Sequence, residues 1–279
     1  MTDCDPLNIR RILVREVNWV GDAVLTLPAL EALHSRFPSA AITLLARPWV
    51  GGLFAGHPAV QGLITYRSKD AHRGLRGRWR LARELKQGGF DLAVLFPNSF
   101  DAAFVPWLAG IPRRAGYPTD GRRWLLTHPV LNGIAAASRH QVDRYLAIVR
   151  VLGGDGSPRL RLPVSEPARR QSADLLWQRG ITGAGLRVAL SPGSIYGGAK
   201  RWPSERFAAL ADGLAESHGA RIFLLGAGGE LPILNQVASH MRRAAVNLGG
   251  HTDLPTLVGL LERMHLLVSN DTGAMHIAA

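Results

Sequence analysis

The stretch Ser191-Pro-Gly-Ser-Ile-Tyr-Gly-Gly-Ala-Lys-Arg-Trp-Pro-Ser-Glu-Arg206 decides the fold, because it joins an apolar run at 186–190 to a helical pattern at 207–217. A strand that breaks into a glycine loop and restarts as a helix leaves free backbone N–H groups that converge on one spot. Glycines let the backbone approach an anion closely, and Lys200 adds a flexible positive charge. We therefore interpret the loop as a cradle for a diphosphate, with an ordinary loop and a surface lysine as the alternative.

Composition limits the class of protein. The 279 residues are 47% hydrophobic and 19% charged, which is typical of a globular chain with room for two domains of about 100–200 residues each. The single cysteine, Cys4, allows no disulfide framework, which fits a reducing compartment. The polar N-terminus is unlike a signal peptide, and no apolar run approaches the roughly 18–20 residues of a membrane span, so we expect a cytoplasmic protein.

The formal net charge of +12 and the isoelectric point near 11.1 predict an anionic partner. Basic residues are densest between Arg67 and Lys86, with Trp79 among them. A solvated helix face is the alternative interpretation of that cluster. No helix-turn-helix, zinc-ligand spacing or aromatic RNA-binding signature accompanies it, so nucleic acid is the least favoured partner. A membrane face and a phosphorylated substrate are the other two candidates.

Short apolar runs alternate with helical patterns along the whole chain. The predicted strands are 11–17, 41–46, 62–66, 91–96, 186–190, 221–225, 246–248 and 265–269. Alternation of strand and helix is typical of parallel sheets covered on both faces, so the predicted fold is α/β with two Rossmann-like doubly wound domains. A segment rich in Gly, Ser and Pro sets the boundaries: first domain 1–155, linker 156–168 and second domain 169–279.

Loops after the predicted strands carry the candidate site residues, because ligands of such sheets bind outside the carboxyl ends of the strands. Asp22 follows the first strand and is either a helix cap or a general base. Glu230 follows a second glycine turn and is either a helix cap or an acceptor for ribose hydroxyls. That turn lacks the full dinucleotide fingerprint, which disfavours an oxidoreductase. The turn 271–273 is a second candidate anion site, with His276 one helical turn further along.

Six segments together resemble a known family. They are Asn18-Trp-Val-Gly-Asp22, Leu27-Pro-Ala-Leu30, Pro97-Asn-Ser-Phe100, Ala109-Gly-Ile-Pro112, Lys200-Arg-Trp-Pro203 and Ser269-Asn-Asp-Thr-Gly-Ala-Met-His276. The set is similar to the ADP-heptose:lipopolysaccharide heptosyltransferases, in particular to the heptosyltransferase II group of glycosyltransferase family 9, and it covers nearly the whole chain. The resemblance implies a GT-B fold, in which two Rossmann-like domains face across a cleft, with the acceptor side N-terminal and the ADP-sugar side C-terminal.

The resemblance also implies roles for individual residues. Asp22 would be the base on the acceptor hydroxyl, and Lys200 would neutralise the donor diphosphate. Glu230 would hold the adenosine ribose. The other donor contacts would be Ser194, Thr252, Asp271, Thr272, Gly273 and His276. The acceptor contacts would be Asn98, Ser99, Arg113 and Arg114, with Arg122 and Arg123 as further basic candidates.

The activity implied by the resemblance is inverting transfer of heptose from ADP-L-glycero-D-manno-heptose to the inner core of lipopolysaccharide, at the second heptose. The acceptor would be a phosphorylated lipid A core at the inner face of the cytoplasmic membrane, where the protein would be peripheral. Neither a metal nor a cofactor besides the donor would be needed. The alternatives are another nucleotide-sugar transferase or epimerase of the GT-B type, and a non-catalytic phosphoglycan-binding protein.

Two features depart from the family pattern. Asp101 stands where a basic residue is expected, which bears on the acceptor contacts. The chain also stops at Ala279, a few residues into a helix, whereas family members continue through several more elements. We therefore expect the second sheet to lack an edge and part of its apolar surface to be uncovered.

Overall fold

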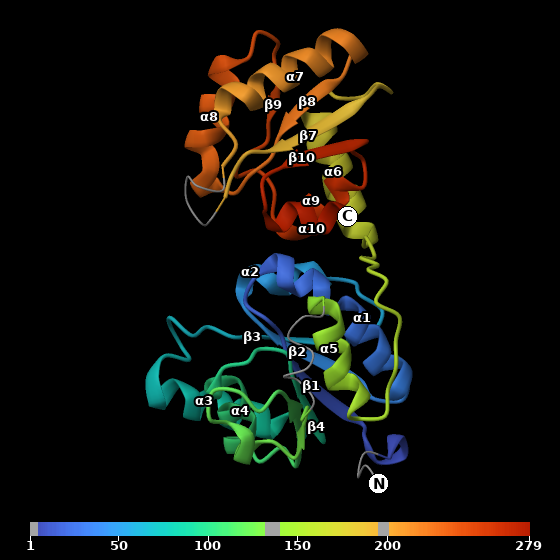
Figure 1. The fold of residues 1–279 in the computed structure, drawn as a ribbon, viewed down its shortest axis with the longest axis vertical. Helices are drawn as coiled ribbons and strands as arrows, with labels where there is room; N and C mark the ends of the chain where they lie inside the picture. Colours follow the sequence, from blue (N-terminus) through green and yellow to red (C-terminus); the bar gives the residue numbers. More distant parts are fainter. Residues whose placement is uncertain (1–4, 132–139, 195–200) are drawn as a thin grey trace. The chain divides into compact units, whose positions relative to one another are not determined.

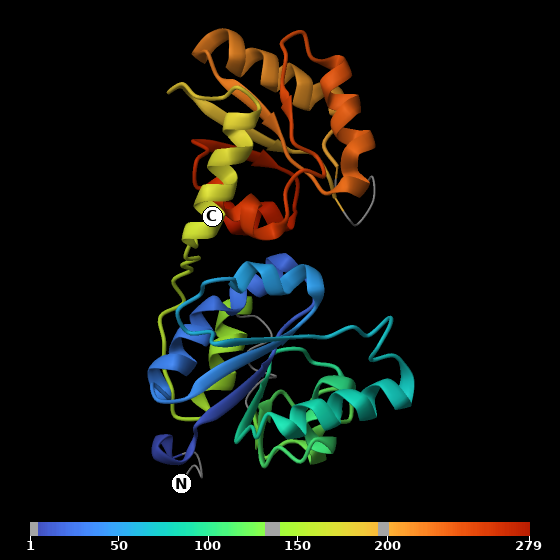
Figure 2. The ribbon, with the colours of Figure 1, turned by 180° about the vertical axis from the view of Figure 1, so that it is seen from behind.

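The computed structural model describes residues 5–131, 140–194 and 201–279, and it divides into two compact units between residues 162 and 163 (Figures 1 and 2). The division falls inside the predicted linker, 156–168. Helix α6 (Glu166–Gln178) begins within that segment, because Ser165 caps its first turn at 3.4 Å and Pro167 is compatible with a helix start. The irregular part of the linker therefore ends at Ser165.

In the described residues, unit 1 (Met1–Leu162) contains a six-stranded sheet in the order β3-β2-β1-β4-β5-β6, with every neighbouring pair parallel. Its strands are β1 (Arg11–Arg15), β2 (Ala41–Ala46), β3 (Gly62–Thr65), β4 (Leu92–Leu95), β5 (Arg113–Gly116) and β6 (His128–Pro129). The first four agree with predicted runs and are rich in Ile, Leu, Val and Ala. β5 and β6 are not predicted from the sequence, because neither contains an apolar run.

Helices cover both faces of this sheet: α1 packs against α5 on one face, and α3 packs against α4 on the other (Figures 1 and 2). The helices are α1 (Val20–Arg36), α2 (Pro48–Gly51), α3 (Gly74–Gln87), α4 (Phe100–Leu108) and α5 (Gln141–Arg150), and the 3-10 turns are η1 (Pro6–Asn8), η2 (Gly52–Phe54) and η3 (Arg123–Leu125). A proline at position 28 predicts either a kink in this helix or a helix start near Thr26, and the second alternative is wrong because α1 begins at Val20 and contains Pro28. Burial of residues 23–30 offsets the backbone hydrogen bond that Pro28 removes.

In the described residues, unit 2 (Pro163–Ala279) contains a four-stranded parallel sheet in the order β10-β7-β8-β9. The strands are β7 (Arg187–Ser191), β8 (Arg221–Leu224), β9 (Val246–Asn247) and β10 (Leu266–Ser269), and all agree with predicted runs. One apolar cluster packs α7 (Ser204–His218) and α8 (Leu231–His240) against the sheet. A second cluster packs α6 and α9 (Leu254–Leu261) against it, and η5 (Gly228–Glu230) and α10 (Gly273–Ala278) complete the unit. β10 lies at one edge of the sheet in the described residues, and Leu266 is 46% exposed.

The first four strands have the same order in both units, β3-β2-β1-β4 and β9-β8-β7-β10. The connections reverse direction between β1 and β4 and between β7 and β10, and ligands of doubly wound sheets bind outside the carboxyl ends of the strands at such points. Arg15 pairs with Leu95 and Ser191 pairs with Ser269, so the two strands of each pair end level with one another. The predicted α/β class with two parallel sheets is therefore confirmed.

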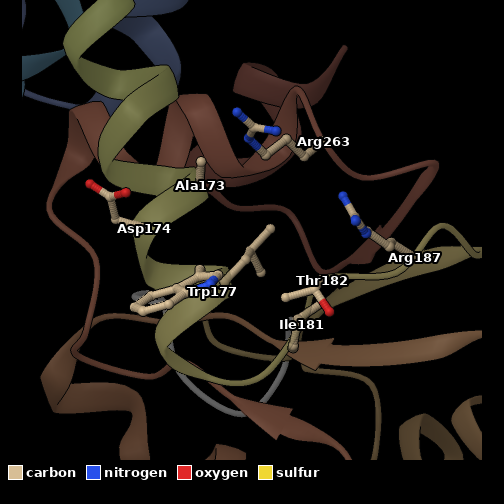
Figure 3. Close-up of a pocket in the computed structure, with 8 residues that line it drawn as sticks. Ala173, Asp174, Trp177, Ile181, Thr182, Arg187 and Arg263 are labelled. Atoms are coloured by element: carbon tan, nitrogen blue, oxygen red, sulfur yellow. The ribbon is translucent and has the colours of Figure 1, made fainter.

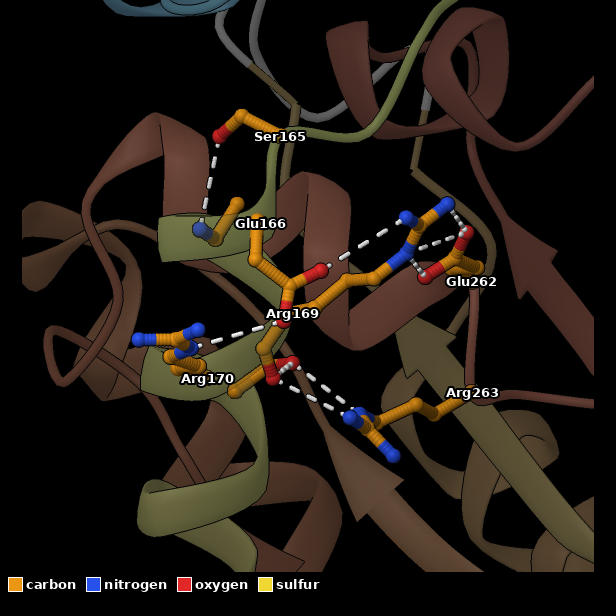
Figure 4. A network of polar contacts seen from close by, with 8 residues as sticks. Ser165, Glu166, Arg169, Arg170, Glu262 and Arg263 are labelled. Atoms are coloured by element: carbon orange, nitrogen blue, oxygen red, sulfur yellow. Dashed lines mark hydrogen bonds and ion pairs between the residues drawn. The ribbon is translucent and has the colours of Figure 1, made fainter.

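Helices α6 and α9 pack so closely that one position between them has no room for a side chain. A Cβ on Gly259 would lie 2.3 Å from Ala168 O. Beside this contact, Arg169 donates to both carboxylate oxygens of Glu262 at 2.9 and 2.8 Å, and Arg263 Nη2 donates to Arg169 O at 3.0 Å (Figure 4). These bonds fasten α6 to the end of α9.

We predict that Gly259→Ala lowers the free energy of unfolding by about 1–3 kcal/mol, because the added methyl group overpacks the contact with α6. Gly213→Ala in α7 is the matched control: its Cβ meets no heavy atom within 4 Å, so it should raise stability by about 0.5–1 kcal/mol. Urea unfolding of the three proteins measures both changes. Equal stability of Gly259→Ala and the wild type would contradict the close packing.

Candidate functional site

The loops that follow β7 and β10 leave from the same edge of the unit 2 sheet. Their last residues, Ser191 and Ser269, are paired in parallel register, and Asn270 N donates to Ser191 O at 3.3 Å. Ser194 and the turn 271–273 follow these strands directly. The structure thus brings these predicted donor contacts to one edge, and Lys200 lies outside the described residues.

The side chain of Asn270 fastens both ends of the loop between β7 and α7. Its Nδ2 donates to Pro192 O at 2.8 Å, and its Oδ1 accepts a hydrogen bond from Trp202 N at 3.0 Å. Arg201 Nη2 adds a hydrogen bond to Ser194 O at 2.8 Å. One amide group therefore ties each end of this loop to the end of β10. This role is not predicted from the sequence, because a motif does not say which loop its asparagine holds.

Two hydroxyl groups at this edge are buried without a partner. Neither Ser194 Oγ nor Thr272 Oγ1 forms a hydrogen bond with any residue that the structure describes. Thr272 occupies the N-cap position of α10, but its side chain makes no capping bond. A buried hydroxyl without a partner costs about 1–3 kcal/mol, and such a group in a native protein indicates a ligand, an ion or water. The phosphate oxygens of a nucleotide are suitable acceptors for both hydroxyls.

The carboxylate of Glu230 reaches the same edge. Its Oε2 accepts a hydrogen bond from Ala227 N at 2.8 Å, which closes the 3-10 turn η5, but Glu230 makes no side-chain capping bond at the start of α8. A Cβ built on Gly193 would lie 1.8 Å from Glu230 Oε1, which shows how closely this carboxylate approaches the loop after β7. Position 193 must therefore be glycine while Glu230 keeps this conformation. The proposed contact between Glu230 and a ribose stays a prediction.

The other predicted donor contacts lie in the same unit. Thr252 is half-buried between β9 and α9, and His276 is half-buried on α10. Gly273 is the first residue of α10, and Asp271 is exposed in the turn before it. Their positions are compatible with one site at the carboxyl edge, and their individual roles stay predictions.

At the carboxyl edge of unit 1, Asp22 lies half-buried in the first turn of α1. Glu16, just after β1, is fully buried: its Oε1 accepts from Val17 N at 2.8 Å and its Oε2 lies 3.3 Å from Thr26 Oγ1. Burial raises the pKa of Glu16 to about 8, and the charge of Asp22 contributes to the shift. Glu16 is therefore mostly neutral at pH 7. Glu16 is not predicted as a site residue from the sequence, where it lies within the predicted strand 11–17, and the observed strand β1 ends one residue earlier, at Arg15.

Two arginines meet at this edge without an ion pair to any described carboxylate. Arg15 is 5% exposed, and its guanidinium donates to Leu45 O at 3.1 Å and to Asn18 Oδ1 at 3.2 Å. Arg47 Nε donates to the same Asn18 oxygen at 3.1 Å. The two guanidinium carbons lie 4.6 and 4.8 Å from the centroid of the Tyr66 ring. Burial lowers the pKa of Arg15 to about 10, which still leaves it charged at pH 7.

Asp101 contributes a carboxylate beside Arg15, Arg47 and Tyr66. It accepts a hydrogen bond from the Tyr66 hydroxyl at 2.7 Å and forms an ion pair with Arg78 of α3. Asp101 thus links Arg78 to Tyr66, and the Tyr66 ring contacts the guanidinium groups of Arg15 and Arg47. The basic residue expected at position 101 is absent, and Arg15 and Arg47 supply positive charge from the ends of β1 and β2 instead. An anionic group is the ligand that this edge favours.

Among the predicted acceptor residues, Arg122 holds a loop in place, whereas Asn98 and Ser99 are exposed on that loop. Arg122 is fully buried and donates to Tyr117 O at 2.8 Å, to Pro97 O at 2.6 Å and to Ser99 O at 2.9 Å. It therefore fastens the loop that carries Asn98 and Ser99, while its Nη2 is buried without a hydrogen-bond partner in the described residues, and its acceptor role stays a prediction. Asn98 and Ser99 themselves are exposed at the carboxyl edge, after β4.

Arg113 and Arg114 do not lie at that edge. They are the first two residues of β5, and Arg113 pairs with Leu92, the first residue of β4. Arg114 Nε donates to Leu125 O, and burial lowers the pKa of this arginine. The structure therefore places both arginines at the amino end of the sheet, away from Asn98. The sequence does not reveal this position, because β5 lacks the apolar run that predicts a strand.

A cavity of about 470 Å³ opens elsewhere in unit 2, beside α6 (Figure 3). Trp177, Arg187 and Arg263 contribute to its lining. Because Arg187 is the first residue of β7, the cavity lies at the amino end of that strand. It is distinct from the site that the loops form at the carboxyl end.

We predict that Glu16 makes stability fall as the pH rises. The folded chain keeps this proton up to about pH 8, whereas an unfolded chain releases it near pH 4.5. The contribution is therefore complete below about pH 4.5 and is lost as the pH rises through about 8, at about 1.4 kcal/mol per pKa unit. Urea unfolding of the wild type and Glu16→Gln, measured from about pH 5 to about pH 9, should show the wild type losing stability relative to the variant.

Glu31→Gln is the control for that measurement, because Glu31 is an exposed carboxylate on α1, the helix that follows Glu16. Its unfolding free energy should follow that of the wild type at every pH. Parallel curves for the wild type and Glu16→Gln would show that Glu16 titrates normally in the folded protein.

Comparison with known proteins identifies the family. The family model described as glycosyltransferase family 9 (heptosyltransferase) matches residues 78–279. The chain is 33% identical to lipooligosaccharide heptosyltransferase 2 of Haemophilus ducreyi and 30% identical to lipopolysaccharide heptosyltransferase 2 of Escherichia coli, each over 96% of this chain and 79% of the relative. A solved structure of the E. coli ADP-heptose LPS heptosyltransferase II is 29% identical, with a TM-score of 0.81 over 96% of this chain and 81% of that one. The chain therefore belongs to glycosyltransferase family 9, the heptosyltransferases.

Proposed function

We propose that this chain is an inverting glycosyltransferase that moves heptose from ADP-L-glycero-D-manno-heptose to the inner core of lipopolysaccharide, at the second heptose. The names of its relatives, lipooligosaccharide and lipopolysaccharide heptosyltransferase 2, support the sugar and the acceptor. The similar solved structure is described as an ADP-heptose transferase, which supports the donor. Within the chain, the carrying observation is the pair of buried hydroxyls, Ser194 and Thr272, that have no described partner at the ligand edge of unit 2.

In the proposed donor site, Ser194 and Thr272 donate hydrogen bonds to the diphosphate, and Lys200 adds the positive charge that neutralises the departing ADP. Glu230 retains one carboxylate oxygen for the hydroxyls of the adenosine ribose, since the other already accepts from Ala227 N. Family likeness assigns the remaining donor contacts to Thr252, Asp271, Gly273 and His276. Neither a metal nor a further cofactor has a part in this proposal.

Asp22 is the proposed general base. It removes the proton of the acceptor hydroxyl while that oxygen attacks the anomeric carbon, and the bond from this carbon to the diphosphate oxygen breaks. Attack opposite the leaving group inverts the configuration of the sugar. Glu16 supports this role indirectly: because it is mostly neutral at pH 7, it does not add a second negative charge beside the base.

The proposed acceptor is a phosphorylated lipid A core. Its anionic groups suit the guanidinium groups of Arg15 and Arg47 beside Tyr66, with Asn98 and Ser99 at the same edge of unit 1. No helix in the described part of the chain has both the length and the hydropathy of a membrane span. We propose that the chain works at the inner face of the cytoplasmic membrane and binds there peripherally.

We predict that Asp22→Asn lowers the rate of heptose transfer by about 10²–10⁴-fold, the usual contribution of a general base, and leaves the dissociation constant for ADP unchanged.

Lys200→Ala should weaken ADP binding itself by roughly tenfold to a hundredfold, because a charged hydrogen bond contributes about 1.5–3 kcal/mol. Transfer of labelled heptose and calorimetric titration of ADP measure the two effects separately.

Asp143→Asn is the matched control, because Asp143 occupies the first turn of α5 as Asp22 occupies the first turn of α1. It removes the same carboxylate from a helix start and should leave transfer intact. Normal turnover by Asp22→Asn would refute the base assignment. Binding of ADP without transfer by the wild type would instead favour a non-catalytic phosphoglycan-binding protein.

A further inference from the structure

Helix α3 presents two different faces. Its inward face is apolar: Leu81, Ala82 and Leu85 are buried in the core of unit 1. Its outward face, here called the α3 face, is formed by exposed side chains, namely Leu75, Arg76, Trp79, Arg80, Arg83 and Lys86. The helix sequence contains five basic residues and one acidic residue, so the α3 face is strongly positive.

Large apolar side chains lie among these charges. Leu75 is 72% exposed and Trp79 is 66% exposed, and their spacing of four residues makes them neighbours on the helix surface. On a helix face that contacts only water, two exposed apolar side chains would contribute no burial energy. The chain has seven tryptophans, and every one is at least 38% exposed, although tryptophan is highly buried on average. Exposed tryptophan is typical of membrane–water interfaces.

A second exposed aromatic cluster lies on α4, the helix that packs against α3. Trp107 and Trp124 meet edge to face with ring centroids 5.6 Å apart, and they are 40% and 61% exposed. Phe104 stacks on Trp107 at 5.8 Å. Unit 1 thus exposes tryptophan from α4 and η3 in addition to α3.

The charges of the α3 face are available to an outside partner. Arg78 is engaged with Asp101, and Glu84 lies 3.8 Å from His72. None of the three arginines at 76, 80 and 83 forms an ion pair with a carboxylate of the described residues. Their guanidinium groups can therefore donate to external anions.

We propose that the α3 face docks onto a bilayer surface that carries anionic lipid headgroups. Arginines next to Trp and Leu on one exposed helix face are typical of helices that lie at such an interface, where basic side chains contact phosphates and Trp79 reaches the headgroup level. The charge of the face is complementary to an anionic leaflet, and Leu75 and Trp79 fit its apolar boundary. This inference rests on the peripheral membrane binding proposed above and identifies its surface, and because vesicle binding and heptose transfer are measured separately, failure of one is distinguishable from failure of the other.

Co-sedimentation of the full chain with vesicles tests the proposal. Vesicles of phosphatidylcholine mixed with phosphatidylglycerol should bind the wild type, binding should weaken as salt is raised, and pure phosphatidylcholine vesicles should bind it poorly. The triple variant Arg76→Gln, Arg80→Gln, Arg83→Gln should lose roughly a hundredfold in affinity, at about fivefold for each arginine. Trp79→Ala should lose at least about tenfold.

Matched controls separate the α3 face from the general charge of the chain. Arg159→Gln, Arg161→Gln, Arg170→Gln removes three exposed arginines elsewhere, and Trp177→Ala removes a tryptophan that is 71% exposed. Both controls should bind anionic vesicles as the wild type does. Equal losses in the two triple variants would overturn the proposal, because binding would then follow net charge alone.

Hydrogen exchange of the wild type provides a measurement that needs no variant. Anionic vesicles should slow amide exchange in residues 75–87. Protection confined to another segment, absence of binding to anionic vesicles, or binding of RNA in place of vesicles would each overturn the assignment.

Discussion

The side-chain amide of Asn270 is the interaction on which the ligand edge of unit 2 depends. It donates to the start of the loop after β7, through Pro192 O, and it accepts from the end of that loop, through Trp202 N. An amide can donate and accept at once, which neither an aspartate nor an alanine would do here. The backbone that carries Ser194 is held in place before any ligand arrives, and such preorganisation is what a site for a diphosphate requires.

The two units use different chemistry at equivalent edges of their sheets. Unit 2 offers neutral hydroxyls at Ser194 and Thr272, while unit 1 places the guanidinium groups of Arg15 and Arg47 over the Tyr66 ring. Burying the charge of Arg15 without an ion pair to a described carboxylate is costly, which supports the proposal that an anionic acceptor binds at this edge. Glu16 does not cancel that charge, because burial keeps it mostly neutral at pH 7. The proposed nucleotide side and the proposed acceptor side therefore differ in their chemistry.

Sequence patterns predict what depends on local residue type. Apolar runs reveal β1 and β7 because strands buried on both faces need them, and a strand followed by a glycine turn marks the loops of Asp22 and Glu230. Contacts that depend on which strands pair, and in which register, are not predictable in this way. β5 has no apolar run, so Arg113 was expected at the wrong end of the sheet. The partners of Asn270 become visible only once β10 is paired with β7.

A crystal structure of the chain with ADP tests most directly whether the carboxyl edge of unit 2 is the donor site. We expect diphosphate oxygens within hydrogen-bonding distance of Ser194 Oγ and Thr272 Oγ1, with both hydrogen bonds of Asn270 to the loop ends preserved. Density for ADP at another place, such as the cavity beside Trp177, with the two hydroxyls still unpaired, would contradict it.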